Sequence, residues 1–460
     1  MKKIIFIKSL LILFFYATQA LGHNTSTTVE INSSDDCITI ESKISGSLDG
    51  DTLLFSSGSF DLSCMPSYTL SKSLSFEGKA GETILNGGGV NGFLLSDGLD
   101  FIEARNIEFT NFGRVFSHST VGITISRLVF DNVVISDSES GVFLSAHVNE
   151  AWITNSSFNN ISASSAGSAI FLGYKDDAGL QSAPDLAGRI HIDGNNFTNL
   201  SRLSGNLEFH AILVRGNQAV ITNNIIKNFS CNSNISCESI YAHANNSQIL
   251  GNNISNAEGS ASILLKGHAI GASNHQVKDN VIYTPTSVEY GFNNAASIEI
   301  QVDNAVVSGN AIYNPRGYAV LEEAGQENIV ITDNHVFHPY GLYVMLIRSS
   351  SSLISGNSVI RPIIDASGQI RMFRFENVNG VDMNSIIIRD NNIVLDNQTR
   401  TSSDLFLFHF VGLYGQTISN VIIKGNVVTD LGSVVGARKF FIKDNVQTNP
   451  QDENNTLNNF

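Results

Sequence analysis

The sequence predicts an all-β fold, a single-stranded solenoid in which each coil is one turn of a parallel β-helix. Two observations lead to this prediction: a six-residue phrase recurs along the chain, and apolar residues alternate on both sides of it. Composition is a third. Charged residues make up only 15% of the 460 residues, below the roughly 25% of ordinary soluble domains, so long charged helical faces are few.

The first 22 residues have the composition of a secretory leader. Two lysines precede an apolar stretch at residues 10–16, and small residues follow up to Ala20. This pattern is typical of a signal peptide cut near Ala20, and the apolar stretch is shorter than the roughly 20 residues of a membrane span. No later segment is apolar for long enough to span a membrane. We therefore expect residues 1–22 to be removed and the mature chain to be soluble, and secreted or periplasmic.

Net charge narrows the choice of partner. The formal charge is −15, whereas binding to a nucleic-acid backbone needs a net basic face. We expect no nucleic-acid partner, although a local basic cluster stays compatible with this charge.

Four cysteines form two near pairs in the sequence, Cys37 with Cys64 and Cys231 with Cys237. Four cysteines allow three connectivities, and spacing alone does not choose among them. Because export favours disulfides, we expect two bridges, one near the amino end and one across a loop.

The recurring phrase reads apolar, any, Gly/Asp/Asn, Asn, any, apolar. Its asparagines are Asn195, Asn224, Asn252, Asn280, Asn310, Asn334, Asn357, Asn391, Asn426 and Asn445, and residues 125–130 and 153–158 look like degenerate copies. A period in the twenties with variable insertions predicts a solenoid, and alternating Val, Ile and Phe predict strands. The residue before each asparagine suits a left-handed turn. We expect the asparagines to stack coil upon coil as a structural ladder.

Ahead of the repeats, "CITIESKISGSLDGDTLLFSSGSFDLSC" (residues 37–64) and "SLSFEGKAGETILNGGG" (residues 73–89) resemble the amino-terminal coils of the pectate-lyase-like β-helix superfamily. The resemblance implies a right-handed parallel β-helix over residues 23–447, followed by a polar tail at 448–460 that we expect to be disordered. It implies no single activity, because the superfamily contains lyases, hydrolases, epimerases, phage tailspikes and non-catalytic surface proteins.

A second strand precedes the asparagine turn in each coil. Its runs are residues 211–215, 239–243, 262–266, 297–301, 319–323 and 344–348. Side chains alternate along a strand, and the second and fourth residues, such as Ile263 and Leu265, are almost all apolar. The third and fifth residues must therefore lie on the outer face.

The fifth places of these runs predict a polar column on neighbouring coils. Its members are Arg215, His243, Lys266, Gln301, Glu323 and Arg348, and we expect Arg374 and His409 to continue it. The third places add Tyr241 and Glu299 to the same face. Cations about 5 Å apart repel one another, so their grouping in an acidic, charge-poor protein suggests an anionic ligand that lies along the axis.

Superfamily members that cleave uronate polysaccharides use β-elimination on this outer sheet. The chemistry needs a base, and a positive charge near the uronate carboxylate. Neighbouring cations disfavour the charged form of a lysine, which would allow Lys266 to act as the base beside Arg215 and His243. Tyr241 would be the proton donor. In these roles and in its fold the chain resembles lyases of the chondroitinase-B and alginate-lyase type.

The expected ligand is an anionic polysaccharide. Its further binding residues are Lys175, His268, Glu299, Gln301, Glu323 and Arg348, with Lys175 on a loop at residues 173–188 that could form a groove wall. We expect that loop and residues 231–237 to project from the solenoid.

Other functions stay open. A glycoside hydrolase would use closely placed carboxylates, here Glu299, Glu322, Glu323 and Asp303, although Glu322 falls at an inward place. An epimerase is disfavoured because the Asp-Pro-His-Asp run of β-helix alginate epimerases is absent. A non-catalytic glycan-binding or surface protein explains the leader and the solenoid equally well. The cofactor is open: calcium is possible, but no loop has a recognisable calcium spacing.

Overall fold

The computed structural model describes residues 26–458 except for residues 119, 121, 165–166, 174–187, 203–207, 232–236, 268–273, 285–295, 316, 324, 340–342, 363–368, 378–381, 396–403, 413–416, 432–437, 445–447 and 449. The expected leader, Lys175 and His268 lie outside the described residues. None of the described helices has the length and apolar character needed to cross a membrane.

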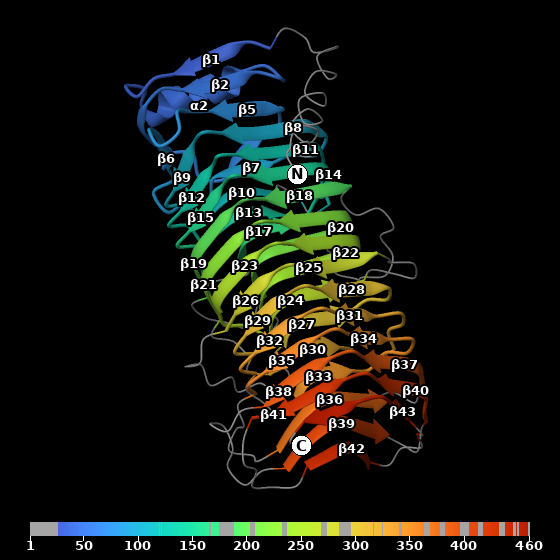
Figure 1. Cartoon of the computed structure of the whole chain (residues 1–460). Helices are drawn as coiled ribbons and strands as arrows, with labels where there is room; N and C mark the ends of the chain where they lie inside the picture. The colour runs from blue at the N-terminus through green and yellow to red at the C-terminus, as the bar shows by residue number, and fades with distance from the viewer. Residues whose placement is uncertain are drawn as a thin grey trace, which may run out of the picture.

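The chain forms a right-handed parallel β-helix, as expected, and its coils follow one another from one end of an elongated molecule to the other (Figure 1). The strands of each coil pair in parallel with their counterparts in the coils before and after. They lie in three stacks that run along the axis. Strands β20 and β22 are long enough to turn from the first stack into the second.

The first stack carries the runs that contain the polar column. It contains β4 (Tyr68–Leu70), β7 (Phe93–Leu95), β10 (Arg114–His118), β13 (Ser140–Leu144), β17 (Gly167–Leu172), the first halves of β20 (Phe209–Thr222) and β22 (Glu238–Leu250), β24 (Ala261–Lys266), β27 (Ala296–Gln301), β30 (Tyr318–Glu322), β33 (Tyr343–Ile347), β36 (Gln369–Asn377), β39 (Asp404–Gly412) and β42 (Arg438–Asp444).

The second stack leads into the asparagine turn. It contains β1 (Thr28–Ile31), β2 (Thr52–Phe55), β5 (Leu74–Glu77), β8 (Leu99–Arg105), β11 (Thr124–Asp131), β14 (His147–Thr154), β18 (Arg189–Asp193), the second halves of β20 and β22, β25 (His275–Lys278), β28 (Ala305–Ser308), β31 (Val330–Thr332), β34 (Leu353–Ser355), β37 (Met383–Arg389), β40 (Ile418–Lys424) and β43 (Gln451–Glu453).

The third stack leaves the turn. It contains β3 (Gly58–Asp61), β6 (Thr83–Asn86), β9 (Glu108–Thr110), β12 (Val134–Ser136), β15 (Ser157–Asn159), β16 (Ser162–Ala163), β19 (Asn196–Arg202), β21 (Ile225–Cys231), β23 (Asn253–Ala257), β26 (Val281–Tyr283), β29 (Ala311–Tyr313), β32 (His335–Phe337), β35 (Ser358–Ile360), β38 (Asn392–Leu395), β41 (Val427–Asp430) and β44 (Thr456–Asn458). The inward side chains of all three stacks form one continuous apolar core.

The predicted asparagine ladder joins the second stack to the third. Asn252 is typical: its backbone N–H and its Nδ2 both donate to Oδ1 of Asn280, each at 2.9 Å, and Nδ2 also donates to the carbonyl of Ile221 at 3.0 Å. The preceding residue, Gly251, has a φ of 64°, the left-handed conformation that the turn requires. The buried side-chain amides thus form hydrogen bonds with one another and with the backbone along the axis of the solenoid.

Two details of the ladder differ from the sequence prediction. The slot after Asn426 is taken by Asn455, whose Oδ1 accepts from the backbone N–H and Nδ2 of Asn426, whereas Asn445 lies outside the described residues. At the amino-terminal end of the ladder, Ser156 takes a ladder position as expected. Residues 125–130 do not, because they lie within β11, and the ladder position of that coil is occupied by Val133.

The carboxyl-terminal tail also differs from the expected disorder. Strands β43 and β44 pair with β40 and β41 and so continue the solenoid. Their side chains are exposed, which accounts for their polar composition: backbone pairing and the ladder slot of Asn455 define this coil without apolar burial.

The amino-terminal end is closed by α2 (Cys37–Gly46), the only α-helix among the described residues (Figure 1). Asp36 caps it by accepting a hydrogen bond from the backbone N–H of Thr39 at 2.8 Å, and Ile40 and Ile44 are buried. A disulfide between Cys37 and Cys64 ties this helix to the coil beneath it. This bridge and the Cys231–Cys237 bridge confirm the expected pairing.

Candidate functional site

The outer face of the first stack is not a simple alternation of inward and outward residues. The five positions of each run are numbered one to five, and the preceding residue is position zero. Positions one and two both enter the core, as Ala211 and Ile212 do, so the strand bends there. Position zero therefore faces outward: Ala261 packs with Leu264 of position three in a separate, outer apolar cluster.

The polar column predicted at position five is present and is called here the lysine column. Strand pairing places Arg215 opposite His243, His243 opposite Lys266, and Lys266 opposite Gln301. Glu323 and Arg348 continue it, with Oε2 of Glu323 3.9 Å from Nη1 of Arg348. Neighbouring members are separated by one strand spacing, roughly 4.8 Å.

Arg374 and His409 were predicted to continue the lysine column, and this is wrong. Arg374 pairs with Leu346, and His409 pairs with Arg374, so both belong to position three. The register is set by Met372 and Phe373, which enter the core at positions one and two. Glu376 takes position five on that coil.

The residues of the lysine column differ in their exposure to solvent. Arg215 and His243 are each only 2% exposed, whereas Lys266 and Gln301 are half-buried. Of the three basic residues at the head of the column, only Lys266 therefore has a substantial exposed surface for a ligand.

Arg215 is held mainly by an aromatic ring. Its guanidinium lies 5.4 Å from the centre of the Phe171 ring, and Nη2 is 3.9 Å from Oε2 of Glu208. Burial lowers the pKa of Arg215, but an arginine stays charged in proteins. Its positive charge acts through a medium of low dielectric and is felt strongly on neighbouring coils.

Tyr241 lies at position three, at the centre of this region. Its ring packs in the outer apolar cluster with Leu213 and Leu264 and stacks on His243, with ring centres 5.9 Å apart. Burial raises the pKa of Tyr241, so the phenol keeps its proton at neutral pH. None of the described residues forms a hydrogen bond with its hydroxyl.

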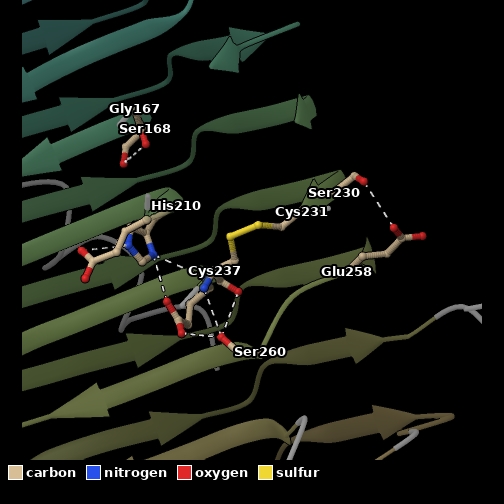
Figure 2. The surroundings of a disulfide bond; sticks show 10 residues. Gly167, Ser168, His210, Ser230, Cys231, Cys237, Glu258 and Ser260 are labelled. Carbon is tan, nitrogen blue, oxygen red and sulfur yellow. Dashed lines mark hydrogen bonds and ion pairs between the residues drawn. A yellow bond between two sulfur atoms is a disulfide. The ribbon is translucent and has the colours of Figure 1, made fainter. Parts of the chain in front are cut away.

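Sequence reasoning missed a buried histidine–glutamate pair at position zero. Nδ1 of His210 is 3.0 Å from Oε2 of Glu238, and Ser260 donates to the other oxygen of Glu238 at 2.6 Å. Figure 2 shows His210 close to the start of β22, where Cys237 is bridged to Cys231. The ring of His210 lies 5.3 Å from that of Tyr241.

Burial alone would lower the pKa of His210, but the neighbouring carboxylates of Glu208 and Glu238 outweigh burial and raise it. Strict alternation places His210 and Glu238 inside the solenoid, so the sequence pattern does not predict this pair on the outer face. A signal was available: a core of this kind does not accept a histidine and a glutamate on adjacent coils unless they pair.

Glu299 and Gln301 lie at the solvent-exposed edge of the site. Nε2 of Gln301 donates to Oε1 of Glu299 at 2.6 Å. Burial raises the pKa of Glu299 to about 7, although the Gln301 hydrogen bond works in the opposite direction. The carboxyl group is therefore largely uncharged in slightly acidic solution and does not repel an anion near Lys266.

The carboxylates of the hydrolase alternative do not converge. Glu322 is inward and fully buried, as expected, and Asp303 accepts a backbone hydrogen bond from Glu327 at 2.8 Å in a turn. Only Glu299 and Glu323 share the outer face. Among the described residues no three His, Cys, Asp or Glu side chains are grouped as a metal site requires, so no residue is assigned to calcium.

Two expected contacts and one expected loop fall outside the described residues. They are Lys175, His268 and the greater part of residues 173–188. Of residues 231–237, the structure describes the two bridged cysteines.

Comparisons with known proteins return β-helix structures of low similarity. A PL6 alginate lyase in complex with a trisaccharide is 12% identical, over 95% of this chain and 87% of that chain, with a TM-score of 0.36. A mannuronic acid specific family 6 lyase from human gut microbiota is 11% identical, over 93% and 91%, with a TM-score of 0.35. The Streptococcus pneumoniae surface protein and adhesin PfbA is 10% identical, over 95% and 98%, with a TM-score of 0.32.

No family model and no curated protein matches the chain. Similarity at the level of these structures does not identify an activity for this chain.

Proposed function

We propose that the exported chain binds an anionic, uronate-containing polysaccharide along the lysine column and cleaves it by β-elimination at Lys266. The observation that carries the proposal is the pairing of Arg215, His243 and Lys266 on three successive coils, beside the protonated phenol of Tyr241. Three basic side chains aligned along one face are the arrangement that a carboxylate-bearing chain would need.

In the proposed reaction, the amine of Lys266 removes the proton next to the uronate carboxylate. The electron pair of that C–H bond forms a carbon–carbon double bond, and the bond to the glycosidic oxygen breaks. Tyr241 gives its proton to this leaving oxygen. The buried charge of Arg215, with His243, stabilises the negative charge that develops on the carboxylate.

The proposal assigns supporting roles to the exposed end of the column. Gln301 would bind sugar hydroxyls, and Glu299, uncharged at slightly acidic pH, would tolerate the nearby carboxylate. Glu323 and Arg348 would contact the chain further along the axis. Lys175 and His268 remain proposed contacts from neighbouring segments.

The burial of Arg215 and His243 favours a second candidate function, a non-catalytic glycan-binding protein. In that case the two side chains hold the outer face together, and Lys266 alone attracts the anionic ligand. The protein would then bind the glycan without cleaving it.

One experiment separates the two. The wild-type chain is incubated with alginate, pectate and glycosaminoglycans, and the ultraviolet absorbance of unsaturated uronates is followed. Elimination gives a rise with one polymer that is lost in Lys266→Ala and kept in Lys278→Ala, a lysine of the same coil on another face. Reducing ends without absorbance would mean hydrolysis, and binding without either would mean a glycan-binding protein.

A further inference from the structure

Three arginines gather on the outer face of the first stack, beyond the proposed catalytic group. Arg348 occupies position five after β33, and Arg371 and Arg374 occupy positions zero and three of β36. Together with Tyr343 and Glu376 they are called the arginine cluster. From Lys266 the pairing runs through Gln301 and Glu323 to Arg348, which is three strand spacings, or roughly 14 Å.

Tyr343 lies at the centre of the arginine cluster. Its hydroxyl oxygen accepts hydrogen bonds from Nη1 of both Arg371 and Arg374, and both guanidinium groups lie over its ring, 5.1 and 4.6 Å from the centre. Tyr318 of the neighbouring coil stacks on the ring at 5.9 Å. A phenol that accepts two hydrogen bonds still has its own proton to donate, and none of the described residues accepts it.

The cluster already binds one carboxylate of the protein. Nε and Nη2 of Arg348 donate to one oxygen of Glu376 at 3.1 and 2.8 Å, and Nη2 of Arg374 contacts the other oxygen. Burial would raise the pKa of Glu376, but the two arginines outweigh burial and lower it. The arginine cluster therefore stabilises a negative charge on the buried carboxyl group of Glu376.

Glu376 does not use all the donors. Arg348 and Arg374 share this one carboxylate, and the Nη1 group of Arg348 lies 3.9 Å from Oε2 of Glu323. That distance is too long for a hydrogen bond. The side chains of Arg348 and Arg374 are 22% and 17% exposed, so a ligand can reach them.

We propose that the arginine cluster is a second anion site, which binds a carboxylate of a uronate residue further along the polysaccharide. A guanidinium fork matches a carboxylate in two hydrogen bonds, which favours this ligand over a neutral sugar. The Tyr343 hydroxyl donates to a sugar oxygen beside it. The identity of the ligand rests on the proposed function, whereas the anion site itself does not depend on cleavage at Lys266.

The test is the length dependence of binding. Oligouronates of increasing length are titrated calorimetrically into the chain carrying Lys266→Ala, so that they are not cut. The affinity should rise once an oligomer spans the distance from position 266 to Arg348. Arg348→Met keeps the apolar stem and should remove this rise, about a tenfold loss for long oligomers, while short oligomers bind unchanged.

Two further variants control for charge and folding. Arg389→Met removes the same charge from an exposed residue of the second stack and should have no effect. Tyr343→Phe removes only the hydroxyl and should weaken long oligomers alone. Every variant should still unfold in one cooperative thermal transition, with a lower midpoint in Arg348→Met because Glu376 loses a partner.

The outcomes separate this proposal from the proposed function. If Arg348→Met affects short and long oligomers equally, affects neither, or acts no more than Arg389→Met, the second anion site is refuted even where elimination is observed. If the length-dependent loss is found and no polymer yields unsaturated uronate, the anion site stands and elimination falls. Absence of binding by every oligouronate refutes the site.

Discussion

The carboxyl group of Glu322 lies inside the β-helix, where one of its oxygens accepts a hydrogen bond from the hydroxyl of Ser349. The neighbouring coils place Ile300 and Ile347 at the same position, so the carboxyl replaces a branched apolar side chain in the core. Burial raises the pKa of Glu322 to about 7. The group is therefore protonated in slightly acidic solution and must ionise in the core above that range.

This carboxyl predicts how stability depends on pH. In the unfolded chain the group has the ordinary glutamate pKa of 4.5, so between pH 4.5 and about 7 the native state keeps a proton that the unfolded chain has lost. Stability must fall as pH rises through this window, by roughly 3 kcal/mol in total. Glu322→Gln should remove most of that loss and stabilise the protein at neutral pH.

Urea unfolding at pH values on both sides of the window measures the effect. Glu323→Gln, at the adjacent and half-exposed residue, is the matched control and should keep the wild-type slope. Identical pH profiles for Glu322→Gln and wild type would contradict the prediction.

Glu299 predicts a pH dependence of ligand binding. Its pKa of about 7 means that the side chain is uncharged below neutral pH and carries a negative charge above it. An ionised Glu299 would repel a uronate beside Lys266, so the affinity for an oligouronate should fall as pH rises through 7. In Glu299→Gln this fall should disappear. Calorimetric titration over pH tests this, and a wild-type affinity that rises through the same range would oppose it.

The lysine column predicts graded effects on turnover. Lys266→Met should lower kcat/KM for the cleaved polymer by roughly 10²-fold or more, because it removes the base. Arg215→Met should lower it less, because the buried arginine acts by its charge and does not remove the proton. Both variants are compared by the ultraviolet assay, with thermal midpoints as a control for folding. A larger loss in Arg215→Met than in Lys266→Met would reverse the assigned roles.

The asparagine ladder predicts a large loss of stability from one polar substitution. Asn280→Ala leaves the backbone N–H of Asn252 and the carbonyl of Ile249 without their partner, and each buried polar group left unpaired costs about 1–3 kcal/mol. A loss of roughly 3 kcal/mol or more is expected from denaturant unfolding. Asn253→Ala, at the exposed next residue, should stay within about 0.5 kcal/mol of wild type.

The sequence by itself determined the solenoid, most of the asparagine ladder, and the register of the lysine column from Arg215 to Gln301. These features follow from local patterns: alternation has a period of two, and the turn needs a left-handed residue before each asparagine. Once Ile263 and Leu265 point inward, Lys266 must point outward. Equivalent strands of successive coils then align Arg215, His243 and Lys266 without further information.

Only the tertiary structure decided which outer residues are exposed and which are paired. The bend at position one turns His210 and Glu238 outward and pairs them, although alternation places them in the core. Strand pairing places Arg374 opposite Leu346, at position three, where it contacts Tyr343 on the preceding coil. Local pattern specifies the direction of a side chain from its own strand, whereas burial, pairing and pKa depend on groups that the fold brings from other coils.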